Sequence, residues 1–184
     1  AFSTLLMDGV PATASAVREG KTFAAVGQDI NAIVARKDRA LATETLSKGM
    51  EKLVPELYAQ GKFDGIISFG GSGGTSLVTP AMRALPIGVP KVMVSTMASG
   101  NVSQYVGTSD IVMMPSIVDV AGLNKVSKLI FSNAVLAIAG MVEGRARLKA
   151  DTAESKPLIA ASMFGVTTPC VDAAKDYQIG RAHV

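Results

Sequence analysis

The sequence predicts a doubly wound, Rossmann-like α/β fold, in which a parallel sheet has helices on both faces, followed by the start of a second, similar subdomain. Apolar runs of four to six residues alternate with longer stretches that have the spacing of amphipathic helices. The apolar runs do not alternate with polar residues, which is typical of strands buried on both faces of a parallel sheet. Such sheets bind ligands beyond the carboxyl ends of their strands, where the strand order reverses, so a site is expected in the loops that follow the strands.

The elements follow from these patterns in chain order. Apolar runs predict strands, and they are Phe2–Met7, Gly65–Phe69, Lys91–Ser95, Ile111–Met114 and Pro157–Met163. Helical spacing predicts one or two helices over Asp29–Tyr58, a helix through Met82 and Arg83, a long helix over Lys125–Val142 and a last helix over Val171–Tyr177. Residues 8–28 read as a loop with at most a short helix over 12–19, and 96–108 and 119–124 read as loops.

Two residues set the expected end of the helical stretch over 29–58, and the long helix has an expected inner side. Pro55 is expected to limit the last turn, and Gly61 is expected to stop the helix. On the long helix, the side expected to face the sheet is Val126, Leu129, Ile130, Ala134, Ala137, Ile138 and Met141.

The chain divides into four expected parts. Residues 1–143 form the first subdomain without its N-terminal strand, 144–156 are a charged linker, and 157–178 begin the second subdomain. Residues 179–184 resemble a translated sequencing adaptor, and a natural C-terminal turn is the alternative. The only histidine, His183, lies in that tail.

Composition excludes several classes of function. The chain has 184 residues, 48% of them apolar and 18% charged, so it is not disordered. A net charge of +3 without a basic block argues against nucleic acid as the main ligand. No uninterrupted apolar run reaches the roughly 18 residues of a membrane helix, and a single cysteine, Cys170, fits a reducing compartment, so we expect a soluble, cytoplasmic protein without a membrane partner. With one doubtful histidine, a Ser-His-Asp triad, a Cys-His pair and a histidine metal site have no support.

The sharpest motif is a glycine loop between a strand and a helix. It consists of Gly70, Gly71, Ser72, Gly73, Gly74 and Thr75. Glycines permit positive φ angles and a close approach of ligand to backbone, and the following helix N-terminus presents unpaired N–H groups to a phosphate or carboxylate. The loop matches neither the Walker A pattern nor the dinucleotide fingerprint. The alternative is a tight turn that only packs the strand against the helix.

Two further loops are expected to line the same crevice. The small polar residues of the first are Ser95, Thr96, Ser99, Gly100 and Asn101. In the second, Asp119 and Asn124, together with Asp110, are oxygen ligands suited to Mg²⁺ carried by a nucleotide, while capping of the next helix by Asp119 and Asn124 is the alternative. Lys91 and Arg83 are possible phosphate contacts, with ordinary exposed surface charges as the alternative.

The motifs resemble the Tm-one-like ATP-binding domain family. The resemblance rests on the segments Asp64–Thr75, Thr79–Lys91, Val94–Gly100, Tyr105–Gly107, Asp119–Asn124, Ala139–Met141 and Met163–Val171. It implies two Rossmann-like subdomains with ATP bound by the first, in a group of mostly uncharacterised bacterial and fungal proteins whose plant member inhibits tobamovirus RNA replication. Relative to the family pattern, a Gly-Thr-x-Asp-Thr-Lys-like strand before Ala1 and a glycine-rich segment after Gln178 are missing.

Three functions remain open from the sequence. The first is a nucleotide-binding module for ATP, with Mg²⁺, held by the Gly70–Thr75 loop; the second is an enzyme that acts on a small phosphorylated or carboxylated metabolite; the third is a nucleotide-modulated protein-interaction module. A homo-oligomer is also expected, through Met113–Ile117 and the helix around Leu129–Met141, although core packing explains these apolar segments equally well.

Overall fold

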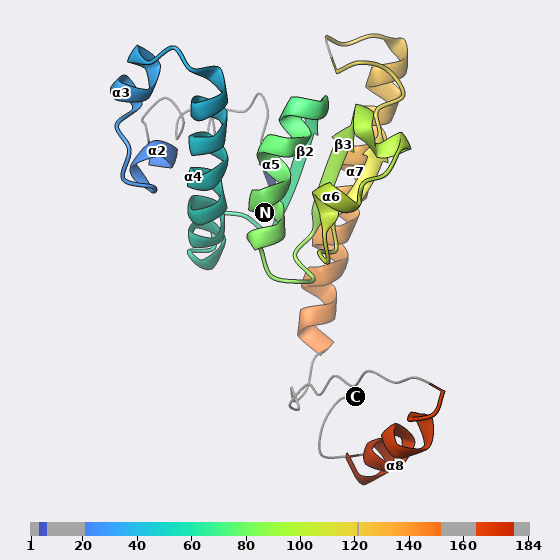
Figure 1. The fold of residues 1–184 in the computed structure, drawn as a ribbon. Coiled ribbons are helices and arrows are strands. Elements are labelled where there is room, and N and C mark those ends of the chain that lie inside the picture. Colours follow the sequence, from blue (N-terminus) through green and yellow to red (C-terminus); the bar gives the residue numbers. More distant parts are fainter. Residues whose placement is uncertain (1–3, 7–20, 121, 152–164, 179–184) are drawn as a thin grey trace. The chain divides into compact units, whose positions relative to one another are not determined.

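The computed structural model describes residues 4–6, 21–120, 122–151 and 165–178. The chain divides into two compact units, Ala1–Arg145 and Ala146–Val184. The described part of the first unit contains a parallel sheet whose strands lie side by side in sequence order (Figure 1). They are β1 (Thr4–Leu6), β2 (Gly65–Gly70), β3 (Lys91–Ser95) and β4 (Val112–Pro115).

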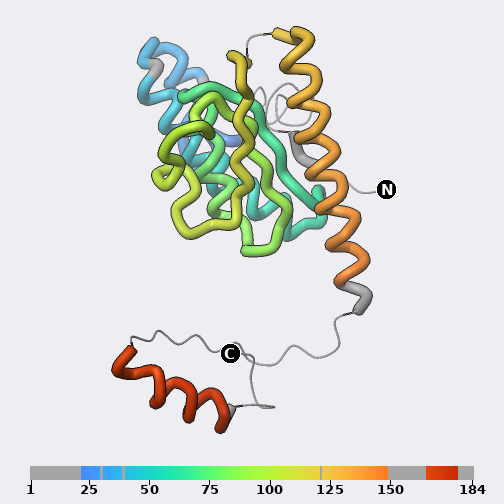
Figure 2. The backbone as a smooth tube through the Cα atoms, turned by 90° about the vertical axis from the view of Figure 1, so that its right-hand side faces the viewer, coloured from blue at the N-terminus to red at the C-terminus, as the bar shows by residue number. Residues whose placement is uncertain are grey.

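Helices cover both faces of this sheet, as Figure 2 shows. One face packs against α4 (Arg39–Ala59) and α5 (Ser72–Ala84), and the other packs against α7 (Lys125–Asp151). Strands that are added in one direction through right-handed crossovers place their connecting helices on one face, as α4 and α5 are placed. Because α7 follows the last of these strands on the opposite face, the doubly wound α/β prediction is confirmed.

The two central strands, β2 and β3, are largely apolar because both of their faces are buried, whereas β4 is partly exposed. Ile66 and Met93 point to the α4 and α5 side, and Ile67, Val92 and Val94 point to the α7 side, all with 0% exposure. The register pairs Ile67 with Val92, which aligns the two buried faces of β2 and β3. Each of these side chains contributes roughly 1.5–3 kcal/mol of burial free energy, so the two central strands form a rigid support for the loops at their ends.

The predicted helical stretch over residues 29–58 is two helices, α3 (Ile30–Ala35) and α4. Each begins at an aspartate whose carboxylate accepts a backbone N–H: Asp29 caps α3, and Asp38 caps α4 with a 3.0 Å bond from Leu41. Gly61 ends α4 with a φ of +67°, as expected from its sequence. Pro55 lies inside α4, four residues before its end, and does not limit it as predicted.

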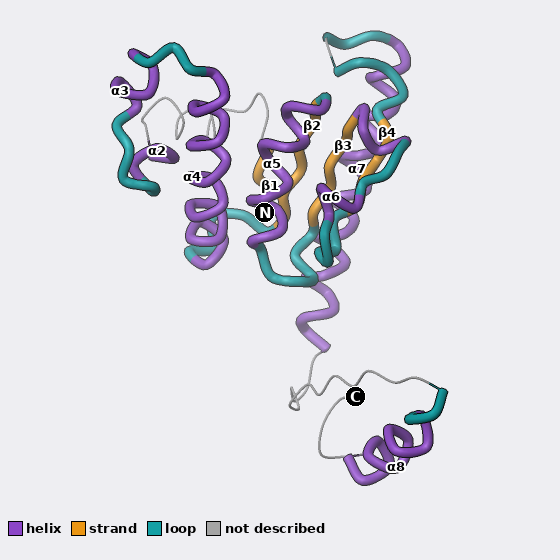
Figure 3. Tube along the Cα trace, viewed as in Figure 1, coloured by secondary structure: helices purple, strands orange, loops and turns teal. Residues whose placement is uncertain are grey.

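Several segments differ from the sequence predictions. The expected loop over 8–28 contains α2 (Lys21–Ala24), and the expected loop over 96–108 contains the 3₁₀ helix η1 (Thr96–Ser99) and α6 (Ser103–Val106). The last helix, α8 (Thr168–Gln178), begins three residues early (Figure 3). The predicted helix over 12–19, the predicted strand Pro157–Met163 and the tail 179–184 lie outside the described residues.

Helix α7 corrects two expectations at once. It continues past its predicted end at Val142 to Asp151, because 143–151 contain helix-favouring Ala, Leu, Glu, Arg and Lys residues. Its sheet-facing side is Ser127, Ala134, Ile138 and Val142, all at most 4% exposed, whereas Leu129, predicted to face inward, is 63% exposed. The helix over Lys125–Leu148 also meets the length and composition criteria of a membrane span, contrary to expectation. Its inner side packs against the sheet through Ala134, Ile138 and Val142.

Candidate functional site

The glycine loop of the sequence is a sharp strand-to-helix turn, called the glycine turn (Gly70–Thr75) from here on. Strand β2 ends at Gly70, Gly71 is the N-cap, and α5 begins at Ser72. The first intrahelical bond runs from the N–H of Thr75 to the carbonyl of Gly71, at 2.9 Å. The N–H groups of residues 72–74 precede that bond, and no side chain caps them among the described residues. The first turn of α5 also contains no acidic residue, so its positive end is open to an anion.

The glycines of this turn have a role other than the one expected. None of them has a positive φ, so left-handed backbone is not the reason for glycine here. A Cβ at Gly70 would lie 3.2 Å from the Cα of Gly74, which makes Gly70 a close contact between strand and helix. A Cβ at Gly73 or Gly74 would meet no described atom within 4 Å. Packing in the described part therefore does not require glycine at 73 and 74, although glycine is a poor helix former.

Thr75 and Ser95 join the glycine turn to the loop after β3. Their hydroxyl groups are 2.6 Å apart, and both side chains are fully buried. Thr75 also donates to the carbonyl of Gly71 at 2.8 Å, and the Ser95 hydroxyl accepts the N–H of Met97 at 3.0 Å. A hydroxyl cannot point to a ligand while it is engaged in this way below the surface. The two residues therefore hold the turns at a fixed distance, and their exposed neighbours form the surface above.

Thr96 is the neighbour that the structure brings to the glycine turn. Its side chain is exposed, and its Oγ1 would lie 3.7 Å from a Cβ at Gly71. Ser99, Gly100 and Asn101 are exposed farther along the same loop. The Oδ1 of Asn101 accepts the N–H of Ser103 at 3.0 Å and starts α6. Thr96 therefore lies next to Gly71, whereas Ser99, Gly100 and Asn101 form the outer part of the loop.

The loop after β4 reaches the same edge of the sheet through Ser116. Its N–H donates to the carbonyl of Ser95 at 3.1 Å, and its hydroxyl donates to the carbonyl of Val118 at 2.7 Å. The next residue, Ile117, has a φ of +65° and is 70% exposed. A β-branched residue in the left-handed region is a strained conformation, and such strain concentrates at functional sites. Neither residue was predicted as part of the site, although Ser116 is a polar residue in the turn that stops an apolar run, which was a usable signal.

The two predicted magnesium ligands of this loop behave differently. The side chain of Asn124 accepts the N–H groups of Val126 and Ser127, each at 2.9 Å, so Asn124 caps α7 as the alternative interpretation proposed. Asp119 does not cap that helix. It is exposed, and its Oδ1 accepts the N–H of Val120 at 2.8 Å.

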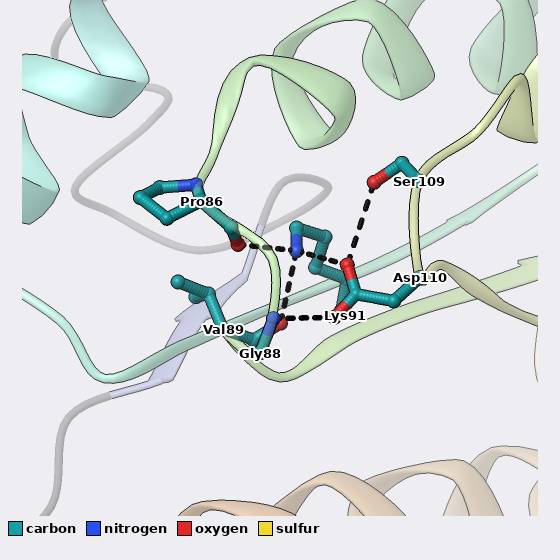
Figure 4. A network of polar contacts seen from close by, with 6 residues as sticks. All are labelled: Pro86, Gly88, Val89, Lys91, Ser109 and Asp110. Atoms are coloured by element: carbon teal, nitrogen blue, oxygen red, sulfur yellow. Dashed lines mark hydrogen bonds and ion pairs between the residues drawn. The ribbon is translucent and has the colours of Figure 1, made fainter. Parts of the chain in front are cut away.

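Lys91 and Asp110 lie at the opposite edge of the sheet, where β3 and β4 begin (Figure 4). The Lys91 ammonium is fully buried and donates to Asp110 at 2.6 Å and to the carbonyls of Pro86 and Val89. Burial pushes the pKa of Asp110 upward, but the hydrogen bonds from Lys91 and from the N–H of Gly88 outweigh it and keep that pKa below its ordinary value. The sequence suggested that Lys91 contacts phosphate or is an exposed surface charge, and that Asp110 is a magnesium ligand. The structure instead shows a buried Lys91 paired with Asp110.

Arg83 is likewise not at the glycine turn. It lies in the last turn of α5 and donates to the carbonyl of Tyr105 at 2.6 Å, which fixes α6 against α5. An open groove of about 640 Å³ does border the start of α5 on the α4 side. Its lining is Ala40, Thr43, Glu44, Ser47, Ser76 and Leu77. Ser76 directly follows the glycine turn, but no residue of the turn itself lines this groove.

Comparison with known proteins places residues 3–147 in a single family model. The model is described as the N-terminal domain of an uncharacterised protein family, UPF0261. A UPF0261 protein of Clostridium tetani is 51% identical over 152 residues, which are 82% of this chain and 37% of that protein. A UPF0261 protein of Rhizobium meliloti is 44% identical over 170 residues, 92% of this chain and 39% of that protein.

A plant protein is similar to the same part of the chain. The ToMV resistance protein Tm-1 of Solanum lycopersicum is 48% identical over 140 residues, which cover 75% of this chain and 19% of that protein. The chain thus spans less than two fifths of the length of the two bacterial relatives and about a fifth of the plant relative. These similarities agree with the resemblance on which the sequence analysis relied.

Proposed function

The chain belongs to the UPF0261 family, in which it matches the N-terminal domain, and we propose that this domain is a nucleotide-binding module whose glycine turn holds the phosphates of ATP. The observation that carries the proposal is the open start of α5. Three successive N–H groups, those of Ser72, Gly73 and Gly74, lie before the first intrahelical bond without a side-chain cap among the described residues. Backbone N–H groups at a helix N-terminus are a recurring binding site for phosphate.

The geometry supports a phosphate rather than a simple packing turn. Gly73 and Gly74 leave open space where side chains would otherwise stand, so a ligand can approach the N–H groups directly. The exposed hydroxyl groups of Ser72 and Thr96 add donors on either side of Gly71. An anion at a helix N-terminus gains roughly 0.3–2 kcal/mol from the dipole, so a useful affinity requires several such donors together, as this turn offers.

ATP with Mg²⁺ is the ligand that the family resemblance implies, and the remaining site residues fit around it. In this proposal the loop from Ser95 to Asn101 and the loop from Asp119 to Asn124 line the crevice beside the phosphates. Asp119 is exposed and is the side chain proposed to supply a carboxylate oxygen for Mg²⁺, because Asn124 is engaged in capping α7. We also place the protein in the cytoplasm, where ATP is abundant and an exposed thiol such as that of Cys170 stays reduced.

The test is calorimetric titration of Mg-ATP, Mg-ADP and inorganic phosphate into this chain and into two variants. Gly73→Ala adds one methyl group in the open part of the glycine turn, and we expect it to weaken nucleotide binding at least tenfold. Gly144→Ala is the matched control: it is also a helical glycine whose Cβ would meet no described atom, but it lies in the C-terminal half of α7. That half packs against the first residue of β2, at the edge of the sheet opposite to the glycine turn.

Each outcome decides between the hypotheses. Saturable binding of ATP that Gly73→Ala weakens and Gly144→Ala leaves unchanged supports the proposal. Binding that neither variant changes would place the nucleotide elsewhere and contradict it. If the folded chain binds no nucleotide, the proposal fails, and the turn should be tested with small phosphorylated or carboxylated metabolites, the substrates of the alternative enzymatic function.

A further inference from the structure

Helix α7 has a second apolar side that nothing in the described chain covers. Its inner side packs on the sheet through Ala134, Ile138 and Val142. On the outer side Leu129 is 63% exposed and Leu136 is 70% exposed. A helix that is apolar on two sides is expected to bury both, since exposed apolar patches on monomers are small.

The outer side has the spacing of a helix–helix seam. Six exposed residues recur at intervals of four and three: Lys125, Leu129, Ser132, Leu136, Ala139 and Glu143. This is the heptad pattern by which one helix packs along another. A groove of about 660 Å³ runs beside the seam and is lined in part by Leu123, Phe131 and Val135, which gives room for side chains of a second helix.

The seam is complementary to itself when it is read in the opposite direction. In an antiparallel pair centred at Ala134, Lys125 meets Glu143, Leu129 meets Ala139, and Ser132 meets Leu136. Opposite charges meet at both ends, and each leucine meets a small residue. A two-fold axis repeats every one of these contacts, as an isologous dimer interface requires. A parallel pair would instead set Lys125 against Lys125 and Glu143 against Glu143.

We propose that the outer face of α7 is an interface between two copies of this chain, which pair through an antiparallel α7–α7 contact. Gly140 supports this arrangement, because it lies beside the seam and a Cβ there would meet no described atom within 4 Å. A glycine within a helix lets a neighbouring helix approach closely. The proposal is independent of the nucleotide site, which lies at the start of α5 on the other face of the sheet.

Sedimentation equilibrium of this chain over a range of concentrations tests the proposal. We expect a monomer–dimer equilibrium, and Leu136→Asp should raise its dissociation constant more than tenfold because the charge enters the seam twice. The control is Ile87→Asp, a similarly exposed apolar residue at 79% in the turn before β3, which should leave the equilibrium unchanged. Thermal unfolding of each variant checks that the fold is retained.

Charge exchange tests the antiparallel register. Lys125→Glu alone and Glu143→Lys alone should each weaken the dimer severalfold, and the double variant should recover it, because the opposite charges meet again with their signs exchanged. A chain that stays monomeric at all concentrations overturns the proposal. So does a dimer unaffected by Leu136→Asp, a double variant that fails to recover, or co-sedimentation with phosphatidylcholine vesicles that Leu136→Asp abolishes, since the face would then be a membrane contact.

Discussion

Replacement of Gly73 and Gly74 by alanine separates the stability of α5 from the affinity of the glycine turn for its ligand. Both residues lie in the first turn of α5 with negative φ, and a Cβ at either would meet no described atom within 4 Å. Alanine therefore fits the folded backbone at both positions without a clash in the described part of the chain. It also restricts the unfolded chain more than glycine does, so the substitutions should stabilise the folded state.

The size of the effect follows from this geometry. A compatible Gly→Ala substitution stabilises a protein by about 0.4–1 kcal/mol, so the pair should add about 0.8–2 kcal/mol to the free energy of unfolding. For a chain of 150–250 residues, 1 kcal/mol shifts Tm by about 2–4 °C. The double variant should thus unfold about 2–8 °C higher than the natural sequence in the absence of ligand.

Ligand binding should change in the opposite direction. In a helix the Cα–Cβ bonds tilt toward the N-terminus, so the new methyl groups at 73 and 74 project toward the place where an anion meets the N–H groups. Loss of close approach to even one or two donors costs at least about 1.4 kcal/mol, which is a tenfold weaker binding. The variant is then more stable and yet binds less tightly.

Thermal unfolding with and without Mg-ATP measures both quantities in one series. The natural chain should show a rise in Tm with ligand, and the double variant should start higher and rise less. A lower Tm without ligand would refute the reasoning, since it would mean that packing requires these glycines. A higher Tm with an undiminished ligand-induced shift would refute the position of the anion, although the stability argument would stand.

Four further predictions concern the loops and the opposite edge. Ile117→Asn should raise the free energy of unfolding by about 1 kcal/mol, because asparagine tolerates the left-handed region better than isoleucine and the side chain is exposed; a lower Tm would contradict this. Lys91→Met should lower the free energy of unfolding by about 2–4 kcal/mol in a denaturant titration, because Asp110 and two carbonyls lose a buried donor. A loss below about 1 kcal/mol would show that the pair is dispensable. Because the pKa of Asp110 is lowered in the folded state, its contribution to the free energy of unfolding is fully present above the unfolded-state pKa of about 3.9 and is lost as the pH falls through the folded-state value. Asp110→Asn should therefore make the free energy of unfolding depend less on pH in this acid range. An unchanged pH dependence would contradict the assignment. Thr75→Val should lower the free energy of unfolding by about 1–3 kcal/mol. A double-mutant cycle with Ser95→Ala should give a coupling energy of at least about 0.5 kcal/mol, whereas additive effects would mean that the two hydroxyls act separately.

The strands and their order of appearance could be predicted because burial on both faces leaves a plain signal in the sequence. β3 has the predicted bounds, and β2 is one residue longer than predicted. The capping aspartates of α3 and α4 and the left-handed Gly61 also leave local signals, because each acts through bonds to nearby residues. The glycine turn was found for the same reason, although its glycines serve close approach and open space instead of positive φ.

Other features depend on contacts between distant residues, which a single sequence does not reveal. Lys91 is the clearest case: a lysine at a strand start is ordinarily exposed, but here a carboxylate 19 residues later and the carbonyls of the preceding turn enclose it. The hydrogen bonds of Thr75 with Ser95 and of Ser116 with the carbonyl of Ser95 are equally non-local. The predicted inner side of α7 was right for Ala134 and Ile138 but wrong for Leu129. The helix is apolar on both sides, so its periodicity alone does not separate the residues that meet the sheet from those that do not.

The two edges of the sheet are expected to differ in what a substitution changes. At the edge where β3 and β4 begin, a buried cation and its acceptors are engaged with one another, so substitution there should change stability and its pH dependence but leave ligand binding largely intact. At the edge where β2 and β3 end, the hydroxyls of Thr75 and Ser95 are hydrogen-bonded beneath the uncapped N–H groups of α5, and the strained Ile117 follows β4. Gly→Ala at 73 and 74 and Ile117→Asn are expected to raise stability there, which would be the behaviour of a site where function, and not packing, determines the residues. If variants at the two edges have the same effects on stability and on ligand binding, the glycine turn is only a connection between strand and helix.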